Sequence, residues 1–273
     1  MDTVGVIGCG EMGRMLVDGF LSSEVLRADE VVVSSRSKGS LDTCAAAWPG
    51  IGIAATNTEL ARQCRLIIIA VRPQEIMAVL REIAPVMDGS EHIVSLAAGV
   101  GLADLESVFW GSVTRTVPTI TSRAWQGTTL ICHGHRVGAG DAIRVEELFS
   151  SIGDVMLVGE DELAVATLLS SCGPGLLVAI IEEMAQAASR AGDLSYDRAL
   201  SLATGMAMAT AACMRRAGEA PPDLIRRVAT GGGMTEVGVQ ELRERLPMVF
   251  DEVFAAMLER HGALERWCGR KPP

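Results

Sequence analysis

Three glycines near the start of the chain have the spacing needed to hold a phosphate-bearing ligand. Gly8, Gly10 and Gly13 form a G-x-G-x-x-G pattern, preceded by an apolar run and followed by apolar residues at helical spacing. In a strand–turn–helix, these glycines make the tight turn, admit a pyrophosphate to the backbone, and let helix and strand pack closely. Free N–H groups at the helix N-terminus bind the anion. Three glycines can also form an ordinary turn. The context favours a dinucleotide site at Gly8, Cys9, Gly10, Glu11, Met12 and Gly13.

The end of the next apolar run, 31–33, bears on which dinucleotide is bound. An NAD site usually carries an acidic residue there that accepts hydrogen bonds from the ribose hydroxyls. This chain instead has Ser34, Ser35, Arg36 and Ser37. Hydroxyl groups and a guanidinium suit a 2′-phosphate, so the stretch favours NADP, with NAD as the alternative cofactor. A solvated serine-rich loop is the competing interpretation.

Two later segments, 70–73 and 97–99, each follow a predicted strand and are expected at the same edge of the sheet as the glycine turn. Ligands bind at the carboxyl ends of parallel strands, and small residues there let a flat nicotinamide ring approach the backbone. Both segments could also be ordinary strand-to-helix turns, with the proline in the first turn of a helix. The predicted cofactor residues from these segments, together with Asn57, are Ala70, Val71, Arg72, Pro73, Ala97, Ala98 and Gly99.

A second glycine-rich stretch, 231–233, precedes a helical pattern that begins near Thr235. Its N–H groups converge on a helix N-terminus, which favours a carboxylate ligand held by the backbone and by the hydroxyls of Thr230 and Thr235. Glu236 suits the helix dipole but would repel a carboxylate if it turned inward. The alternative is a linker in which Thr235 only caps the helix.

Strand and helix patterns alternate over the first half of the chain, which predicts a parallel sheet wound with helices. The strands are expected at 4–7, 31–33, 51–53, 66–71, 92–96, 113–117, 128–132 and 154–158. The helices between them are expected at 57–64, 74–84, 102–109 and 142–151. Beyond residue 160 the pattern is helical, at 161–191 with a break at 173–175, then 196–217, 223–229, 235–245 and 247–266. The fold class is therefore α/β followed by all-α, with a Rossmann-type domain over 1–159 and a helical domain over 160–273.

The composition excludes several classes of partner. The net charge of −10 argues against nucleic acid and anionic membranes. No apolar run is expected to span a bilayer, and no secretory signal is apparent. Seven scattered cysteines without a C-x-x-C indicate reduced thiols in a cytoplasmic protein, with no metal site. His133 and His135 are expected on the surface.

The motifs, taken together, resemble those of the pyrroline-5-carboxylate reductases, which make proline from its cyclic imine precursor. The resemblance covers nearly the whole chain. It rests on V-G-V-I-G-C-G-E-M-G at 4–13, A-V-R-P-Q at 70–74, S-L-A-A-G-V at 95–100, R-T-V-P at 115–118, L-S-S-C-G-P-G at 169–175 and R-V-A-T-G-G-G-M-T at 227–235. It implies an N-terminal Rossmann domain, a helical domain that forms an intertwined dimer, often stacked into decamers, and hydride transfer from NADPH or NADH.

The chain departs from the family pattern mainly in the segments expected to bind substrate. Thr119 replaces an asparagine, Cys172 a serine, Leu176 an aromatic residue, Gly231 a proline and Met234 a small residue. The resemblance implies a substrate site made of Pro118, Cys172, Gly173, Thr230, Gly232, Gly233, Met234 and Thr235. The hydroxyl of Thr235, or a water that it holds, is the candidate catalytic group, hydrogen-bonded to the ring nitrogen.

We therefore expect an NADP-dependent imine reductase that acts on 1-pyrroline-5-carboxylate and assembles through its C-terminal helices into a homodimer or a higher oligomer. One alternative is a reductase of another cyclic or secondary imine. A second is a catalytically silent dimer that binds a dinucleotide. Oxidation of NADPH with and without pyrroline-5-carboxylate distinguishes all three.

Overall fold

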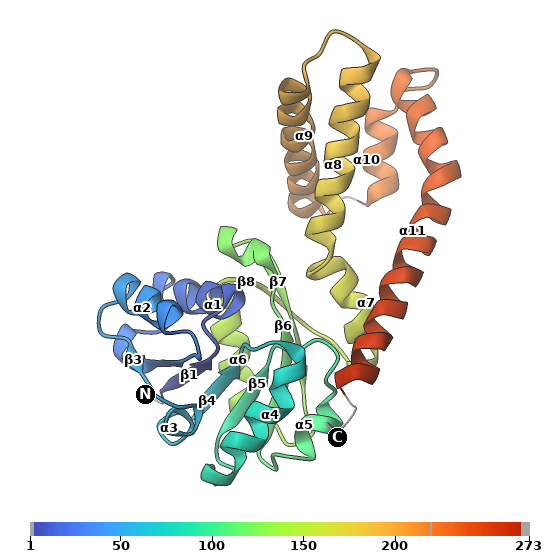
Figure 1. Ribbon diagram of the computed structural model, residues 1–273. Helices are drawn as coiled ribbons and strands as arrows, with labels where there is room; N and C mark the ends of the chain where they lie inside the picture. The colour runs from blue at the N-terminus through green and yellow to red at the C-terminus, as the bar shows by residue number, and fades with distance from the viewer. Residues whose placement is uncertain (1–2, 219, 269–273) are drawn as a thin grey trace. The chain divides into compact units, whose positions relative to one another are not determined.

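The computed structural model describes residues 3–218 and 220–268 (Figure 1). Contacts between residues divide the chain into two compact units. The sheet unit contains the described residues up to Cys172 together with 258–268, and the helical unit contains 173–257. The helix that starts at Glu160 thus belongs to the sheet unit by its contacts. The division into a domain over 1–159 and a domain over 160–273 stays a prediction.

An eight-stranded sheet forms the centre of the sheet unit, in the order β3-β2-β1-β4-β5-β6-β7-β8. Strands β1 to β6 are parallel to their neighbours, with Val4 opposite Val31 and Leu66. The central strands are apolar without interruption because helices cover both faces of the sheet. The strands are β1 (Val4–Ile7), β2 (Val31–Ser34), β3 (Gly52–Ile53), β4 (Leu66–Ile69), β5 (His92–Ser95), β6 (Ser112–Val117), β7 (Gly127–His133) and β8 (Gly153–Leu157).

Alternate residues of each strand point to opposite faces, so the sheet unit has two apolar cores. On β4, for example, Ile67 and Ile69 belong to one core, whereas Leu66 and Ile68 belong to the other. Helices α3, α4, α5 and α7 contribute to the first core, and α1, α2 and α6 contribute to the second. The helices of this unit are α1 (Glu11–Ser22), α2 (Lys38–Ala47), α3 (Asn57–Ala61), α4 (Pro73–Ile83), α5 (Leu102–Glu106), α6 (Ala139–Ser150) and α7 (Glu160–Ser170). Three short 3-10 helices are η1 (Ala28–Glu30), η2 (Ala84–Val86) and η3 (Ile120–Ala124).

The sheet is mostly parallel, as expected, and the exception is β7, which runs antiparallel to β6. The connection between them, residues 118–126, holds only η3 and is too short for the crossover that a parallel pair requires. Helix α6 then connects β7 to β8, and these two strands pair in parallel.

Helix α2 was not predicted, because its apolar residues are few. Its start is nevertheless marked by Ser37, whose side chain accepts a hydrogen bond from the N–H of Ser40.

All regular secondary structure in the described part of 173–257 is helical, as expected. The elements are α8 (Gly173–Ala191), α9 (Tyr196–Ala217), α10 (Pro221–Val228) and α11 (Met234–Cys268), the last of which continues into the sheet unit. Two predicted boundaries are wrong. The break between α7 and α8 falls at Ser171 and Cys172, so Gly173 and Pro174 begin α8, where a proline loses no helical hydrogen bond. Helix α11 is continuous through Pro247, whereas two helices were expected there.

The expectation that no segment could span a bilayer is also wrong by length and composition. Glu160–Ala191, which comprises α7 and α8, is long and apolar enough to do so, and little of its most apolar window is buried in the single chain. No other helix among the described residues meets that criterion. Helix α8 therefore exposes large apolar side chains, among them Leu177 and Val178, which are suited to burial against another surface.

Candidate active site

The turn between β1 and α1 has the geometry predicted for its glycines. Gly8 has a φ of +101°, and a Cβ there would lie 2.6 Å from the carbonyl oxygen of Ala70. A Cβ on Gly13 would lie 1.9 Å from the carbonyl oxygen of Gly8, so only glycine lets α1 pack this closely. Beside Gly10, by contrast, no described atom lies within 4 Å of the Cβ position. The turn is therefore closed at Gly8 and Gly13 and open at Gly10.

The N-terminus of α1 presents N–H groups that no side chain caps. Glu11 stands in this first turn, where its charge would oppose a bound anion. Its carboxylate accepts hydrogen bonds from Arg123 at 2.7 Å and Arg14 at 2.8 Å. These hydrogen bonds, first that of Arg123 and then that of Arg14, lower the pKa of Glu11. The two guanidinium groups draw the ionised carboxylate into ion pairs and offset its charge, so the helix end remains suitable for a phosphate.

A cleft of about 550 Å³ adjoins the glycine turn, at the carboxyl ends of β1, β2 and β4. This is the edge at which parallel α/β sheets bind ligands. The cleft brings together nine of the predicted cofactor residues, namely Gly8, Cys9, Gly10, Ser35, Arg36, Asn57, Ala70, Val71 and Arg72. Open space at Gly10 and an uncapped helix N-terminus fit a pyrophosphate, so these residues fit a dinucleotide.

Hydroxyl and guanidinium groups gather on the β2 side of the cleft. Arg36 extends from the end of β2 and forms an ion pair, 2.5 Å between Nη2 and Oε1, with Glu75 on α4. Ser37 and Ser40 also line the cleft, at the N-terminus of α2. A 2′-phosphate in this corner would meet the helix N-terminus and Arg36, and would compete with Glu75 for the guanidinium.

Asn57 links β2 to α4 beneath the cleft. Its Oδ1 accepts a hydrogen bond from the Ser34 hydroxyl at 2.8 Å, and its Nδ2 donates to Glu82 at 2.9 Å. Ser34 is buried and thus supports the wall of the cleft without lining it. Cys9 is buried as well, and burial raises the pKa of its thiol to about 12. It therefore stays a neutral thiol, and its backbone lines the turn.

Several predicted cofactor residues lie outside this cleft: Glu11, Met12, Gly13, Ser34, Pro73, Ala97, Ala98 and Gly99. Ala98 instead lines a second, smaller pocket of about 160 Å³ in the sheet unit. That pocket also contains Arg115 of β6, Glu160 of α7 and His261 of α11. The structure thus does not join the turn after β5 to the first cleft, and a nicotinamide contact there remains a prediction.

The second glycine loop lies in the helical unit, between α10 and α11. Gly232 has a φ of +75°, and its N–H donates to the carboxylate of Glu236 at 2.6 Å. The N–H of Gly233 donates to the carbonyl oxygen of Thr230 at 2.9 Å. Two of the N–H groups predicted to hold a carboxylate are therefore already bonded. The Glu236 carboxylate does turn back toward the loop, where it accepts a hydrogen bond from one of these N–H groups.

Thr235 is the second residue of α11 and is exposed, so the alternative in which it caps the helix is wrong. Gly233 occupies the capping position, since its carbonyl oxygen accepts from Val237. Met234 is 94% exposed, and its side chain contributes no core packing. Pro118 and Cys172 belong to the sheet unit, whereas Gly173 and the loop belong to the helical unit. A substrate site that combines them remains a proposal.

Comparison with known proteins identifies the family. Residues 160–264 match a family model described as pyrroline-5-carboxylate reductase dimerisation, and residues 3–99 match one described as NADP oxidoreductase, coenzyme F420-dependent. Pyrroline-5-carboxylate reductase 3 of Bacillus subtilis is 32% identical over 272 residues, which cover 99% of this chain and all of the relative. The chain belongs to the pyrroline-5-carboxylate reductase family.

Solved structures of pyrroline-5-carboxylate reductases share this fold. The enzyme from Coxiella burnetii has a TM-score of 0.89 and 24% identity, covering 96% of this chain and 98% of its own. The Plasmodium falciparum enzyme, solved with NADP bound, has a TM-score of 0.85 and 23% identity, covering 97% of this chain and 98% of its own. These likenesses confirm the expected combination of a Rossmann-type sheet and C-terminal helices.

The cleft is also lined by residues that were not among the predicted cofactor residues. Ser40 lies in the first turn of the unpredicted α2. Ile7 ends β1, and Ser37 is the N-cap residue of α2. The remaining ones lie on α4: Gln74, Glu75, Ala78, Val79 and Glu82. Their helical spacing was visible in the sequence, but it marks the apolar face that packs on the sheet and does not show which polar residues border a cleft.

Proposed function

We propose that this chain reduces 1-pyrroline-5-carboxylate to proline with NADP as its cofactor. The observation that carries the proposal is the 32% identity to a pyrroline-5-carboxylate reductase over essentially the full length of both chains. The geometry of the glycine turn supports it independently, because the close packing at Gly8 and Gly13 shapes the turn and the open side of Gly10 leaves room for a pyrophosphate at the N-terminus of α1. When bound, the nicotinamide supplies the hydride that converts the C=N bond to an amine.

The residues of the chain serve mainly to bind and orient the reactants. The N–H groups of Gly10 and of the first turn of α1 hold the pyrophosphate. Arg36 and the N-terminus of α2 hold the 2′-phosphate. The loop at 230–235 holds the substrate carboxylate, which must displace Glu236 from the N–H of Gly232. The Thr235 hydroxyl, directly or through water, hydrogen-bonds the ring nitrogen, where protonation makes the imine a better electrophile.

Oxidation of NADPH, followed by its absorbance, tests this function with pyrroline-5-carboxylate as substrate. We expect turnover with proline as the product. Turnover only with a six-membered cyclic imine or a secondary imine would support the first alternative. NADPH binding without turnover on any of them would support the catalytically silent dimer.

A substitution in the glycine loop tests the substrate site separately. Thr235→Ala should lower kcat/KM by about tenfold or more, because it removes a hydrogen bond to the substrate. The affinity for NADPH should not change, because the pyrophosphate lies at Gly8–Gly13. Thr210→Ala is a suitable control, since its hydroxyl donates to the carbonyl oxygen and the sulfur of Met206, both within the exposed helix α9. Equal kcat/KM in both variants would remove Thr235 from the site.

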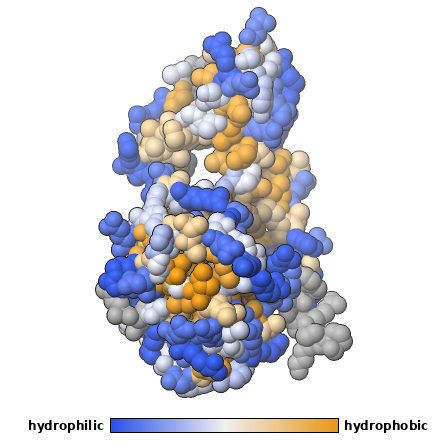
Figure 2. All heavy atoms as spheres, turned by 60° about the vertical axis from the view of Figure 1, so that its left-hand side comes forward, coloured by the Kyte–Doolittle hydropathy of each residue, from blue (hydrophilic) through white to orange (hydrophobic). Residues whose placement is uncertain are grey.

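We further propose a homodimer formed through the residues matched by the dimerisation model, 160–264. The helices of this segment expose large apolar side chains, including Leu177 and Val178 of α8, Leu202 and Met208 of α9, and Leu242 of α11. In Figure 2, hydrophobic side chains form a band along the helical unit, bordered by hydrophilic ones. A second copy, and not a bilayer, is the proposed cover for α8. A stable monomer at micromolar concentration in sedimentation would refute the dimer.

A further inference from the structure

A carboxylate from α7 caps the short helix α5, although the two are far apart in sequence. The N–H of Leu102, the first residue of α5, donates to Oε1 of Glu160 at 2.6 Å. Gly101 occupies the N-cap position, and it has no side chain that could serve this purpose. Helix N-termini need such acceptors, because their first N–H groups have no partner within the helix. Glu160 therefore supplies from α7 what the local sequence lacks.

Arg115 fixes the position of that carboxylate. Its Nη1 donates at 2.9 Å to the same Oε1 of Glu160 that accepts from Leu102. Arg115 is only 6% exposed, and its Nε has no hydrogen-bond partner among the described residues. Because a buried guanidinium is costly without a partner, the Glu160 carboxylate is held where it meets both donors.

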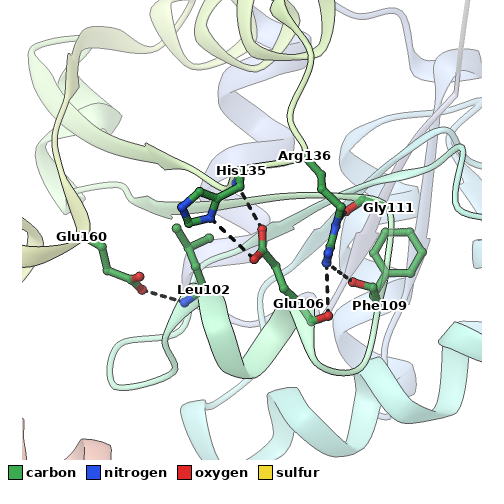
Figure 3. A network of polar contacts seen from close by, with 7 residues as sticks. All are labelled: Leu102, Glu106, Phe109, Gly111, His135, Arg136 and Glu160. Carbon is green, nitrogen blue, oxygen red and sulfur yellow. Dashed lines mark hydrogen bonds and ion pairs between the residues drawn. The ribbon is translucent and has the colours of Figure 1, made fainter.

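The opposite end of α5 is held by a separate group of contacts, which Figure 3 shows together with Glu160. Arg136 donates from Nη2 to the carbonyl oxygens of Glu106 and Phe109, both at 3.1 Å. The Glu106 carboxylate accepts from the N–H of His135 at 3.2 Å. Residues of the β7–α6 connection thus hold the C-terminal end of α5, whereas α7 holds its N-terminal end.

The segment between β5 and α5 is short and is fixed at both ends. It begins after Ser95, includes Gly99 with a φ of +78°, and ends at Gly101. Ala97 and Val100 are buried, whereas Ala98 lines the small pocket that also contains Glu160. The hydrogen bond between Leu102 and Glu160 therefore anchors the end of this segment where α5 begins.

We propose that Glu160 is a positioning residue for hydride transfer, because it holds the end of the 97–101 segment and the nicotinamide ring is proposed to lie over Ala97–Gly99 in that segment. Glu160 is also the first residue matched by the dimerisation model. The bond to Leu102 thus links the start of the dimerisation segment to the turn after β5. This inference rests on the proposed function, since it assigns the segment to the nicotinamide.

Two substitutions of Glu160 test the proposal. Glu160→Ala removes the acceptor, and we expect kcat to fall by about tenfold or more, because small displacements of reacting groups are costly. The Kd for NADPH should change less than threefold, since the other end of the cofactor is held in the larger cleft. Glu160→Gln keeps an acceptor oxygen for Leu102 and should restore most of kcat. In the ligand-free protein, amide hydrogen exchange over 97–106 should be faster in Glu160→Ala and close to wild type in Glu160→Gln.

Glu162→Ala is the matched control, because Glu162 lies in the same turn of α7 but caps its own helix, accepting from the N–H of Gly159. It should lower Tm and leave kcat and exchange over 97–106 unchanged. The proposal is overturned if Glu160→Ala behaves like this control, or if Glu160→Gln is as impaired as Glu160→Ala. Absence of turnover in the wild-type protein would instead refute the proposed function, and the exchange measurement would still test the role of Glu160 in the fold.

Discussion

Two glycine-rich stretches of this chain precede helices, and the structure shapes them differently. The first, at Gly8–Gly13, connects β1 to α1 at the carboxyl edge of the sheet, and close contacts with backbone atoms fix its path. The second, at 231–233, lies on the surface of the helical unit, where a Cβ on Gly231 or Gly232 would meet no described atom within 4 Å. A similar composition thus yields a rigid turn in one place and an open loop in the other.

The helix after each glycine-rich stretch has a glutamate in its first turn, Glu11 in α1 and Glu236 in α11, and the two carboxylates have different partners. Glu11 is drawn into ion pairs with Arg14 and Arg123, which leaves the N–H groups of its helix available. Glu236 instead turns back and accepts a hydrogen bond from the N–H of Gly232. An anion can therefore enter the first site directly, whereas it must compete with a carboxylate at the second. The first site is proposed to bind the cofactor pyrophosphate, and the second is proposed to bind the substrate carboxylate.

The largest difference between the two regions should appear on adding a single methyl group. Gly13→Ala places a Cβ against the carbonyl oxygen of Gly8 and should lower the free energy of unfolding by about 3 kcal/mol or more, with loss of NADPH binding. Gly231→Ala has space around it and should leave stability within about 0.5 kcal/mol. Urea unfolding of both variants measures the contrast. Equal stability would mean that the first turn is not closely packed.

Acid should also affect the two units differently, because residues 173–257 contain no histidine. Burial lowers the pKa of His92 to about 4, with Asp141, His133 and Arg144 as weaker influences. Its Nε2 bonds the Thr114 hydroxyl, which in turn bonds His133. His133 is thus partly buried on β7, and its expected surface position is wrong.

Since this folded-state pKa lies below the ordinary value of 6.5, neutral His92 contributes stability above that pH, and the contribution is lost as the pH falls toward 4. Between pH 7.5 and pH 5 the sheet unit should lose about 2 kcal/mol, measured by urea unfolding. The variant His92→Gln should have a flatter profile. His135→Gln, at an exposed position, should keep the wild-type slope. Identical slopes in all three proteins would contradict the assignment to His92.

Cofactor preference tests the corner of the first site beside Arg36. NADPH should bind more tightly than NADH, and Arg36→Ala should reduce that ratio by about tenfold through loss of a charge-assisted contact. Glu75→Gln should act in the opposite direction, because it removes the carboxylate that pairs with Arg36. Fluorescence titration with both cofactors gives the ratios. Equal affinity of the wild-type protein for NADH and NADPH would rule out the predicted 2′-phosphate site.

The smallest effect is expected at the second loop. Glu236→Ala removes a negative charge and frees the N–H of Gly232, so the KM for pyrroline-5-carboxylate should fall about threefold while the Kd for NADPH stays constant. Glu241→Ala is a suitable control, since Glu241 pairs with Arg245 farther along α11. A rise in KM in Glu236→Ala would show that this carboxylate assists binding of the substrate.

Most of the sheet was predictable because its signals are local. The apolar run at Leu66–Ile69, the glycine turn and the alternation of elements each depend on neighbouring residues. Helix α2 was missed because it packs little apolar surface, and the antiparallel direction of β7 was missed because strand periodicity does not encode direction. Pro247 misled the prediction of α11, where the surrounding helix continues despite the lost hydrogen bond.

The sequence by itself determined the order of the elements, the phosphate-binding turn at Gly8–Gly13 and the family, since these depend on short motifs and their spacing. Only the tertiary structure decided which distant groups meet. It brought Arg36 to Glu75, Asn57 to Glu82, and Glu160 to Leu102. The physical reason is that a hydrogen bond requires its donor and acceptor atoms to lie about 3 Å apart. Residues far apart in the sequence reach that distance only after the sheet has positioned the strands and helices that carry them.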